Sequence, residues 1–397
     1  MFKRDRKRHL FLFILIFIIT FIGVTFNPIN PGKTATSMSE LRGVWITNVD
    51  SEVLFSSLRT TAVLNRLKQL HFNTIYPTIW QGGYTLYPSP VAEKVFGVAI
   101  DPTPGLQHRD MLQELVEQGH QKQLTIIPWF EFGFMAPAES ELVATHPDWL
   151  TQRQDGTTVQ TQGIHDRVWL NPLMPEVQQF ILYLVLEIVQ NYEIDGIQFD
   201  DHFGLPSDFG YDDYTLNLYR QETGKSTAPS QYKDEQWVQW RADKISLFMQ
   251  QVFEAVKAVK PDCIISLSPN PYGFALSAYL QDWLKWQQNG WVEELIIQVY
   301  RSDMERFIAE LEQTELQQAK KQTPVAIGIL SGLKNRSMSI KMIEDQVKAV
   351  RKRDFVGVSF FFYESLWRWA QEPSYQRESQ IQQLFPHPAS RPSMTVF

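Results

Sequence analysis

The chain has 397 residues, of which 44% are hydrophobic and 20% are charged, and its formal net charge is −7 at pH 7. This composition is typical of a globular protein and excludes a largely disordered chain. Basic residues form no stripe outside the extreme N-terminus, so a nucleic-acid partner is not expected. The single cysteine, Cys263, excludes an internal disulfide framework and a cysteine-based metal cluster.

The first 39 residues have the features of a targeting segment and a linker rather than of a folded domain. A basic stretch, MFKRDRKRH, precedes an uncharged apolar run at residues 10–26, the pattern of an export signal. As a helix this run reaches roughly 25 Å, just short of a comfortable membrane span, so a cleaved signal peptide and a retained anchor both remain open. Contact with the membrane is therefore expected only if residues 1–26 are retained. Residues 27–39 are polar, contain Pro and Gly, and read as a linker.

From residue 40 onward, short runs rich in β-branched and aromatic residues alternate with longer amphipathic segments. The runs are typical of buried parallel strands, and the segments have helical periodicity. The expected strands are residues 43–48, 74–80, 125–132, 196–201, 264–270, 294–300, 325–332 and 356–364. The expected helices between them include residues 62–70, 109–122, 174–192, 241–259, 304–321 and 340–353.

This alternation predicts an α/β fold, a (β/α)8 TIM barrel over residues 40–372. A doubly wound open sheet is the alternative, but no glycine-rich phosphate loop follows the first strand. Residues 373–397 are polar and contain proline, and they read as a C-terminal tail.

The stretch DGIQFDDHF, residues 195–203, is expected to be a strand that carries polar groups into an active site. In such barrels the chemistry lies at the carboxyl ends of the strands. Because side chains alternate along a strand, Asp200 should face the barrel axis if Ile197 and Phe199 pack outward on the helices. Asp201 should then lie at the rim, where it binds substrate, orients a neighbour or serves a purely structural role.

Cleavage of a glycosidic bond usually takes two carboxyl groups, one of which donates a proton to the leaving oxygen. Neighbours on one strand cannot easily flank a bond, so the partner of Asp200 should come from another strand. Glu131 and Glu364 are the best placed, and both lie in aromatic surroundings that would raise a carboxyl pKa. Either could instead be a surface glutamate at a strand end.

Further polar and aromatic residues collect at the expected carboxyl ends of the strands or in the loops that follow. The aromatic ones match the apolar C–H faces of sugar rings, although many aromatic side chains in this sequence must belong to the core. The residues expected to bind substrate are Trp80, Trp129, Asn171, His202, Asn270, Gln298, Tyr300 and Trp367.

Other reaction classes find little support. The sequence contains no H-E-x-x-H, G-x-S-x-G or P-loop motif, and its histidines lack the spacing of a zinc site. Three aspartates at residues 207–214 have poor spacing for Ca²⁺ and read as a solvated loop. We therefore expect no metal and no cofactor, and a glycan as the partner.

Several motifs in order resemble one known family. ELRGVWITNVDS, TLYPS, WLNPLMPEVQQFI, YEIDGIQFDDHF, SLSPNPYGFA, DWLKWQQNGWVEELIIQVY, GILSG and GVSFFFYESLW run from residue 40 to about residue 369. Together they resemble the bacterial glycosyl-hydrolase-like family 10. Asp200 and Asp201 match the paired aspartates of the family's D-G-x-x-F-D-D motif.

The resemblance implies a (β/α)8 barrel that acts on glycans in the cell envelope, with peptide-free peptidoglycan strands as the substrate of at least one branch. It therefore implies an exported protein of the periplasm or envelope. The sequence departs from other members in having Phe-Glu-Phe around Glu131 and no cysteine for a lipid anchor. The strand also resembles that of family 18 chitinases, but Gln198 and His202 replace two of its acids, which argues against their substrate-assisted mechanism.

Two further readings compete with a hydrolase. A barrel that binds glycans without cutting them would keep the aromatic residues but lack a second carboxyl group facing Asp200. An anchored scaffold protein would use its outer helices and tail instead. A fold alone cannot separate these functions.

Overall fold

The computed structural model describes residues 38–393, which we call the folded unit. The expected signal or anchor, residues 1–26, and most of the expected linker lie outside the described residues. Within residues 38–393, no helix has both the length and the apolar character that crossing a membrane requires.

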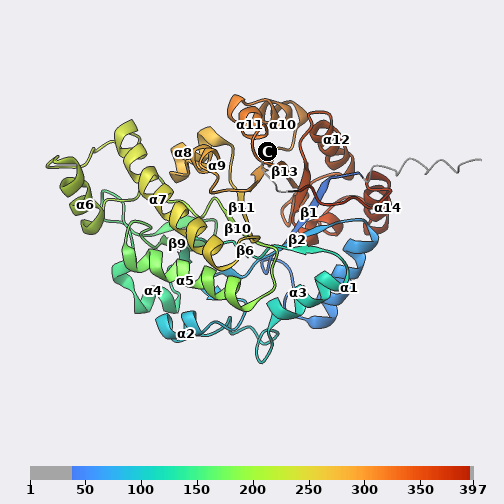
Figure 1. Ribbon diagram of the computed structural model, residues 1–397, viewed down its shortest axis with the longest axis horizontal. Helices are drawn as coiled ribbons and strands as arrows, with labels where there is room; N and C mark the ends of the chain where they lie inside the picture. The colour runs from blue at the N-terminus through green and yellow to red at the C-terminus, as the bar shows by residue number, and fades with distance from the viewer. Residues whose placement is uncertain (1–37, 394–397) are drawn as a thin grey trace, which may run out of the picture. The chain divides into compact units, whose positions relative to one another are not determined.

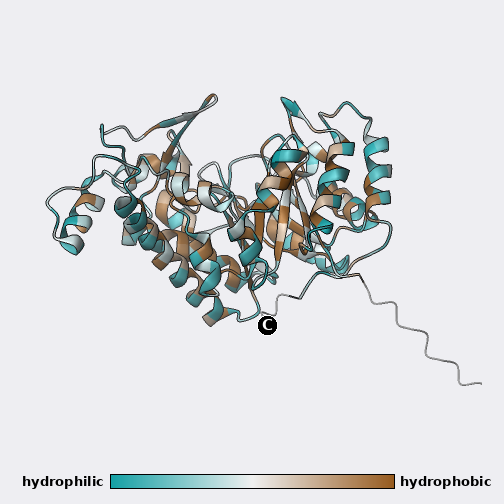
Figure 2. Ribbon diagram, turned by 90° about the horizontal axis from the view of Figure 1, so that it is seen from above, coloured by the Kyte–Doolittle hydropathy of each residue, from teal (hydrophilic) through white to brown (hydrophobic). Residues whose placement is uncertain are grey.

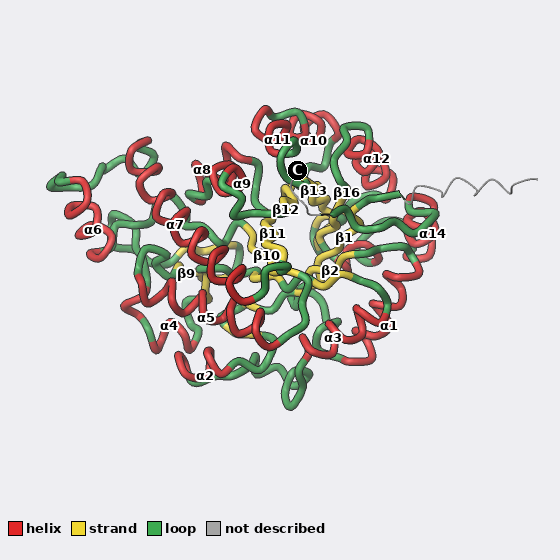
Figure 3. Tube along the Cα trace, in the orientation of Figure 1, coloured by secondary structure: helices red, strands yellow, loops and turns green. Residues whose placement is uncertain are grey.

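A curled parallel sheet lies at the centre of this unit, and helices surround it (Figure 1, Figure 3). Its strands are β1 (Leu41–Ile46), β2 (Thr74–Pro77), β5 (Thr125–Ile126), β6 (Trp129–Phe130), β10 (Gly196–Asp200), β11 (Ile264–Ser268), β12 (Glu294–Gln298), β13 (Val325–Leu330) and β16 (Gly357–Phe361). Every expected strand is thus present, and most of them end a few residues earlier than expected.

The order of the strands shows how far the sheet curls. The order is β5-β2-β1-β16-β13-β12-β11-β10-β6, and all neighbours are parallel. The two outer strands, β5 and β6, belong to the single stretch 125–130, which pairs with β2 through Thr74–Ile75 and with β10 through Gln198–Phe199. The pairing of β16 with β1 excludes the doubly wound open sheet, in which the first and last strands are not neighbours.

Eight of the helices lie between or beside these strands. They are α1 (Ser57–Gln69), α3 (Met111–Gln121), α5 (Pro175–Asn191), α7 (Glu235–Val259), α9 (Trp283–Gln288), α10 (Met304–Leu311), α11 (Thr314–Ala319) and α12 (Ile340–Arg351). The helix expected at residues 304–321 is therefore two helices, since the chain leaves helical geometry at Glu312 and Gln313.

Local chemistry explains where many of the helices begin. The side chain of the residue before the helix accepts a hydrogen bond from a backbone N–H of the first turn, which would otherwise lack a partner. Asp110 does so for α3, Asp234 for α7, Asp303 for α10 and Ser339 for α12.

The remaining elements lie in loops or at the periphery. The short strands are β3 (Trp80–Gln81), β4 (Tyr84–Thr85), β7 (Met135–Pro137), β8 (Gln160–Gln162), β9 (His165–Trp169), β14 (Gly332–Leu333) and β15 (Arg336–Ser337). The short helices are α2 (Pro90–Phe96), α4 (Glu141–Thr145), α6 (Asp213–Thr223), α8 (Tyr272–Tyr279), α13 (Tyr363–Trp367), α14 (Ser374–Leu384) and the 3₁₀ helix Pro147–Trp149.

The core has an outer and an inner part. The outer part packs between the sheet and the apolar faces of the helices, whose polar faces point outward (Figure 2). Val44 and Ile46 of β1 belong to this part, whereas Trp45 between them points into the curl of the sheet and packs on Tyr76 and Trp129. Strand alternation thus supplies both parts of the core.

Residues 374–393, in the segment expected as a C-terminal tail, pack on the rest of the folded unit. Helix α14 buries Ile381, and Phe385 packs on Phe72 and Phe360. Further on, Arg391 reaches Glu294 at the amino end of β12 and forms a buried ion pair with it. Because this segment is polar overall, its composition does not reveal the few apolar and charged residues that attach it to the rest of the fold.

Candidate active site

Strand β10 carries two acids and a histidine to the carboxyl end of the sheet, as the sequence predicts. Ile197 and Phe199 pack outward in the core, while Gln198 points inward and bonds to Trp45 and Ser266. Asp200 follows on the same inward face, at 2% exposure. A carboxyl group buried this deeply needs polar partners.

Asp200 has partners for both of its carboxylate oxygens. Trp129 donates its indole N–H to Oδ2 at 3.1 Å, and the backbone N–H of His202 donates to Oδ1 at 2.8 Å. The imidazole Nδ1 of His202 lies 3.3 Å from the same Oδ1. Burial raises the pKa of Asp200 to about 6, although the charge and hydrogen bonds of His202 act against this rise.

His202 is the positive group of the site. Burial alone would lower its pKa, but the charges of Asp200 and Asp201 raise that pKa to about 10. Its Nδ1 also lies 2.7 Å from the backbone carbonyl oxygen of Glu131. At neutral pH the ring is therefore an imidazolium that joins the end of β10 to the end of β6.

Glu131 is the acid with the most useful pKa. It directly follows β6, is partly buried, and accepts a hydrogen bond at 3.0 Å from the hydroxyl of Thr47 after β1. Burial and then the charge of Asp200 raise its pKa to about 7. A carboxyl group with this pKa is protonated in much of the population at neutral pH and can serve as a general acid.

Asp201 lies on the other side of the site, towards β11 and β12. It is more exposed than Asp200, and it accepts hydrogen bonds at 3.1 Å from Asn270 and at 3.1 Å from Gln298. Burial raises the pKa of Tyr300, and the charges of Asp201, Asp200 and Glu131 raise it further. Tyr300 therefore lies near these three acids. Glu131 and Asp201 thus follow two neighbouring strands, β6 and β10, and the hydrogen bonds of Asp201 turn it away from β6, towards β11 and β12.

The structure therefore assembles Glu131, Asp200, Asp201, His202, Trp129, Asn270, Gln298 and Tyr300, eight residues that the sequence predicts as site residues. Glu364 is placed differently. It lies in the first turn of α13, where it accepts a hydrogen bond from Ser51 and pairs with Arg368. No contact joins Glu364 to the other acids among the residues that the structure describes.

Three further residues that the sequence predicts to bind substrate are buried, and their contacts are with residues outside this cluster. Trp80 is fully buried and donates its indole N–H to the carbonyl of Gly133. Asn171 is also fully buried and bonds to Asp212 and Thr215, which hold the start of α6. Trp367 is 6% exposed, and the guanidinium of Arg66 covers its ring at 3.7 Å.

One residue near the site was not expected. Arg167 of β9 places its guanidinium 5.0 Å from the centre of the Phe132 ring, and the charge of Glu131 acts on it. It is partly buried, and it forms no hydrogen bond or ion pair with another side chain in residues 38–393. A single arginine in the β8–β9 hairpin carries no sequence pattern that would mark it.

Asp200 at the end of β10 and the next two residues, Asp201 and His202, also have the spacing of metal ligands. One ligand atom from each of the three lies within 4.8 Å of the others. The pKa of His202, raised to about 10, makes its imidazolium the positive charge that faces the two aspartates at neutral pH.

Comparison with known proteins identifies the family of the chain. Residues 40–349 match the family described as Glycosyl hydrolase-like 10. The chain is 26% identical over 313 residues to the glycosyl hydrolase DigH of Escherichia coli (strain K12), a match that covers 68% of this chain and 67% of that protein. It is 24% identical over 307 residues to the glycosyl hydrolase YngK of Bacillus subtilis (strain 168), and it spans 55% of that longer protein.

Solved structures support the fold. The glycoside hydrolase domain of PgaB (BpsB) from Bordetella bronchiseptica matches with a TM-score of 0.63 at 12% identity, over 83% of this chain and 95% of that one. The catalytic domain of a β-amylase from Paenibacillus polymyxa matches with a TM-score of 0.58 at 10% identity, over 88% of this chain and 98% of that one. The family resemblance seen in the sequence is confirmed: the chain belongs to the glycosyl hydrolase-like 10 family.

Proposed function

We propose that this protein is a glycoside hydrolase of the cell envelope that cuts peptide-free peptidoglycan glycan strands. The observation that carries the proposal is Glu131, whose pKa is raised to about 7 while Asp201 lies on the other side of the same site. A protonated carboxyl group and a second carboxyl group that flank one bond are the requirement of glycoside hydrolysis.

In this proposal Glu131 donates its proton to the glycosidic oxygen as the bond to the anomeric carbon breaks. The bonding electron pair stays with the oxygen, and positive charge develops on the sugar ring. Asp201, oriented by Asn270 and Gln298, stabilises that charge. A water molecule completes the reaction: its oxygen bonds to the anomeric carbon, and one of its protons passes to the Glu131 carboxylate, which restores the acid.

Asp200 acts through its neighbours. It is too deeply buried to contact a sugar in this state, but its charge raises the pKa of both Glu131 and His202. We therefore place Asp200 as the positioning residue that keeps Glu131 protonated.

The sheet that holds these groups is proposed to be a closed (β/α)8 barrel. Stretch 125–130 then counts as one strand, interrupted at Pro128 and paired on both sides. Counted in this way, the order of the strands around the sheet follows the order along the chain, as in a TIM barrel.

The choice of substrate is based on the complementary charges of the glycan and of the protein. Peptide-free glycan strands carry a free carboxylate on alternate sugars, and a guanidinium is well suited to bind a carboxylate. Arg167 offers such a group above Phe132, close to Glu131. Export across the cytoplasmic membrane by residues 10–26, retained or cleaved, would bring the protein to this substrate.

The test is the release of new reducing ends from purified peptide-free glycan strands by the full chain. Its Glu131→Gln variant should lose the activity, because an amide cannot donate the proton. Equal release by both proteins would place the acid elsewhere. Binding of the strands without release by either would favour the glycan-binding barrel instead.

A further inference from the structure

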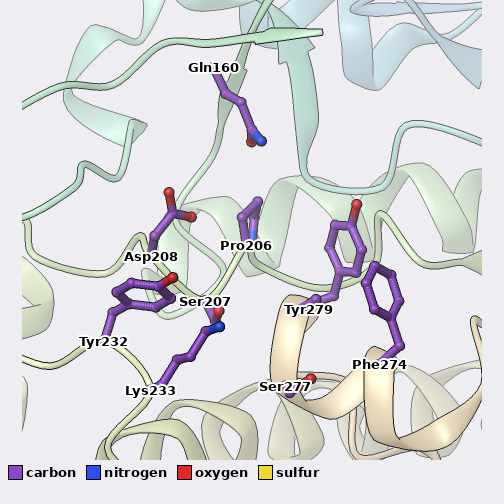
Figure 4. A pocket seen from close by; sticks show the side chains of 10 residues that line it. Gln160, Pro206, Ser207, Asp208, Tyr232, Lys233, Phe274, Ser277 and Tyr279 are labelled. Atoms are coloured by element: carbon purple, nitrogen blue, oxygen red, sulfur yellow. The ribbon is translucent and has the colours of Figure 1, made fainter.

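A cavity of about 360 Å³ opens beside the candidate active site. Helix α8 contributes Phe274 and Tyr279 to one wall, and the opposite wall contains Asp208, Tyr232 and Lys233 (Figure 4). Pro206 lies between the walls, and Gln160 of β8 approaches from above. We call this cavity the side pocket.

The side pocket continues the active site. Tyr279 lies near the aspartates, because burial and then the charges of Asp201 and Asp200 raise its pKa to about 12. The chain that leaves Asp200 runs directly into the pocket, where the N–H of Leu205 donates to the carbonyl of Tyr279 at 2.9 Å. Gln281, just after α8, donates to the backbone carbonyl of Asp200 at 2.7 Å and ties the two parts together.

The walls of the side pocket are held in place before any ligand binds. Arg241 of α7 is fully buried, and its guanidinium donates to the carbonyl of Ser207 at 2.7 Å and to that of Tyr232 at 2.9 Å. It also donates to the carbonyl of Phe209. One planar group thus fixes two loops at once, which lowers the entropy lost on binding.

The surface of the pocket suits a sugar ring. Phe274 is 55% exposed, and its ring meets that of Tyr279 edge to face with centroids 5.9 Å apart. Exposed aromatic rings of this kind have no role in the core, and they can cover the apolar C–H face of a sugar. Asp208, Lys233 and Gln160 offer donors and acceptors for hydroxyl groups at the rim.

A second cavity extends the same path. It has a volume of about 480 Å³ and shares Asp208 and Tyr232 with the side pocket. A path that runs from the acids through two adjoining cavities is suited to a polymer rather than to a single sugar.

We propose that the side pocket is a distal subsite that holds a sugar ring of the glycan strand, several units from the bond that is cut, by stacking on Phe274 and Tyr279. This inference rests on the proposed function. The protein would then distinguish glycan strands by their length, because only strands long enough to reach from the acids to the side pocket gain the extra contact.

The test measures the binding of peptide-free glycan strands of defined length, from two sugars upward, by titration calorimetry. The Glu131→Gln variant of the full chain is the background, so that no strand is cut during the titration. Affinity should rise by about tenfold at the length that first reaches the pocket, a step equal to about 1.4 kcal/mol. Phe274→Ala should remove this step and leave the affinity for shorter strands unchanged.

Tyr375→Ala is the matched control, because Tyr375 is a 77% exposed aromatic residue on α14 and does not line the pocket. The same length step in Phe274→Ala would overturn the subsite, as would an equal loss for all lengths or a lack of binding at every length. Release of reducing ends by the parent chain is measured separately. A length step that depends on Phe274 without any release would refute the hydrolase and keep the subsite.

Discussion

His202 contacts one carboxylate oxygen of Asp200, Oδ1, through two of its groups. Its backbone N–H donates a hydrogen bond to this oxygen at 2.8 Å, and its ring nitrogen Nδ1 lies 3.3 Å from it. The ring also reaches the backbone of Glu131. Protonation of any one of these groups therefore alters the others, and the set titrates as a unit. The first prediction follows from this coupling.

The value of kcat/KM should fall as the pH rises through the Glu131 pKa of about 7, because the proton donor is then lost. Because the charge of Asp200 raises the pKa of Glu131, Asp200→Asn should move the alkaline limb to lower pH. The control is Asp262→Asn, an exposed residue before β11, which should leave the profile unchanged.

An alkaline limb that stays in place in Asp200→Asn would contradict the coupling. A limb that moves to higher pH would contradict its sign.

Glu364→Gln should retain most of the activity of the parent chain. Its carboxylate interacts with Ser51 and Arg368 rather than with the other acids, so removing its charge disturbs only α13. Glu131→Gln should lose activity by about 10²–10⁴-fold, the usual contribution of a general acid. Initial rates of reducing-end release compare the two variants, and a greater loss in Glu364→Gln would reverse the assignment.

Asn270→Ala and Gln298→Ala should each lower kcat more than they change KM. Each variant removes one of the two amide donors that orient Asp201, which acts in the transition state rather than in substrate binding. The double variant should lose less than the product of the single losses, since both amides serve one carboxylate. Asn289→Ala, at an exposed position after α9, is the control. Independent effects of the two variants would show that the amides do not act through Asp201.

Arg391→Ala should destabilise the fold by about 3–5 kcal/mol, the usual cost of leaving a buried charge without its partner. Glu294 is fully buried, and it would keep only the hydrogen bonds from Tyr76 and Ser266. Adding Glu294→Gln to this variant should recover part of the loss. Denaturant unfolding measures the effect, with Arg336→Ala at an exposed position as control. An equal loss in the single and double variants would show that the charge is not the cause.

The strands and the acidic centre could be predicted because their signals are local. Buried parallel strands are nearly continuous apolar runs, and their carboxyl ends converge, so Asp201, Asn270 and Gln298 could be expected together before any contact was known. Alternation along β10 was also enough to place Asp200 inward and Phe199 outward.

The roles of individual aromatic residues could not be predicted, because burial depends on what packs against a ring. Trp80 lies at a strand end like Trp129, yet a loop carbonyl and Phe180 enclose it. Phe274 lies on a short helix and was not expected to bind substrate, yet its ring is exposed in the side pocket beside that of Tyr279. Glu364 and Glu131 both follow a strand in aromatic sequence, and only the three-dimensional contacts separate them.

The ion pair between Glu294 and Arg391 also sets an order of events during synthesis. The two residues are 97 positions apart, and both strands β13 and β16 are made between them. Until Arg391 has left the ribosome, the charge of Glu294 has no partner and must stay hydrated, so the amino end of the sheet around β12 cannot close while the rest of the chain is being made. The protein should therefore reach its final stability late, after its active-site strands are already in place.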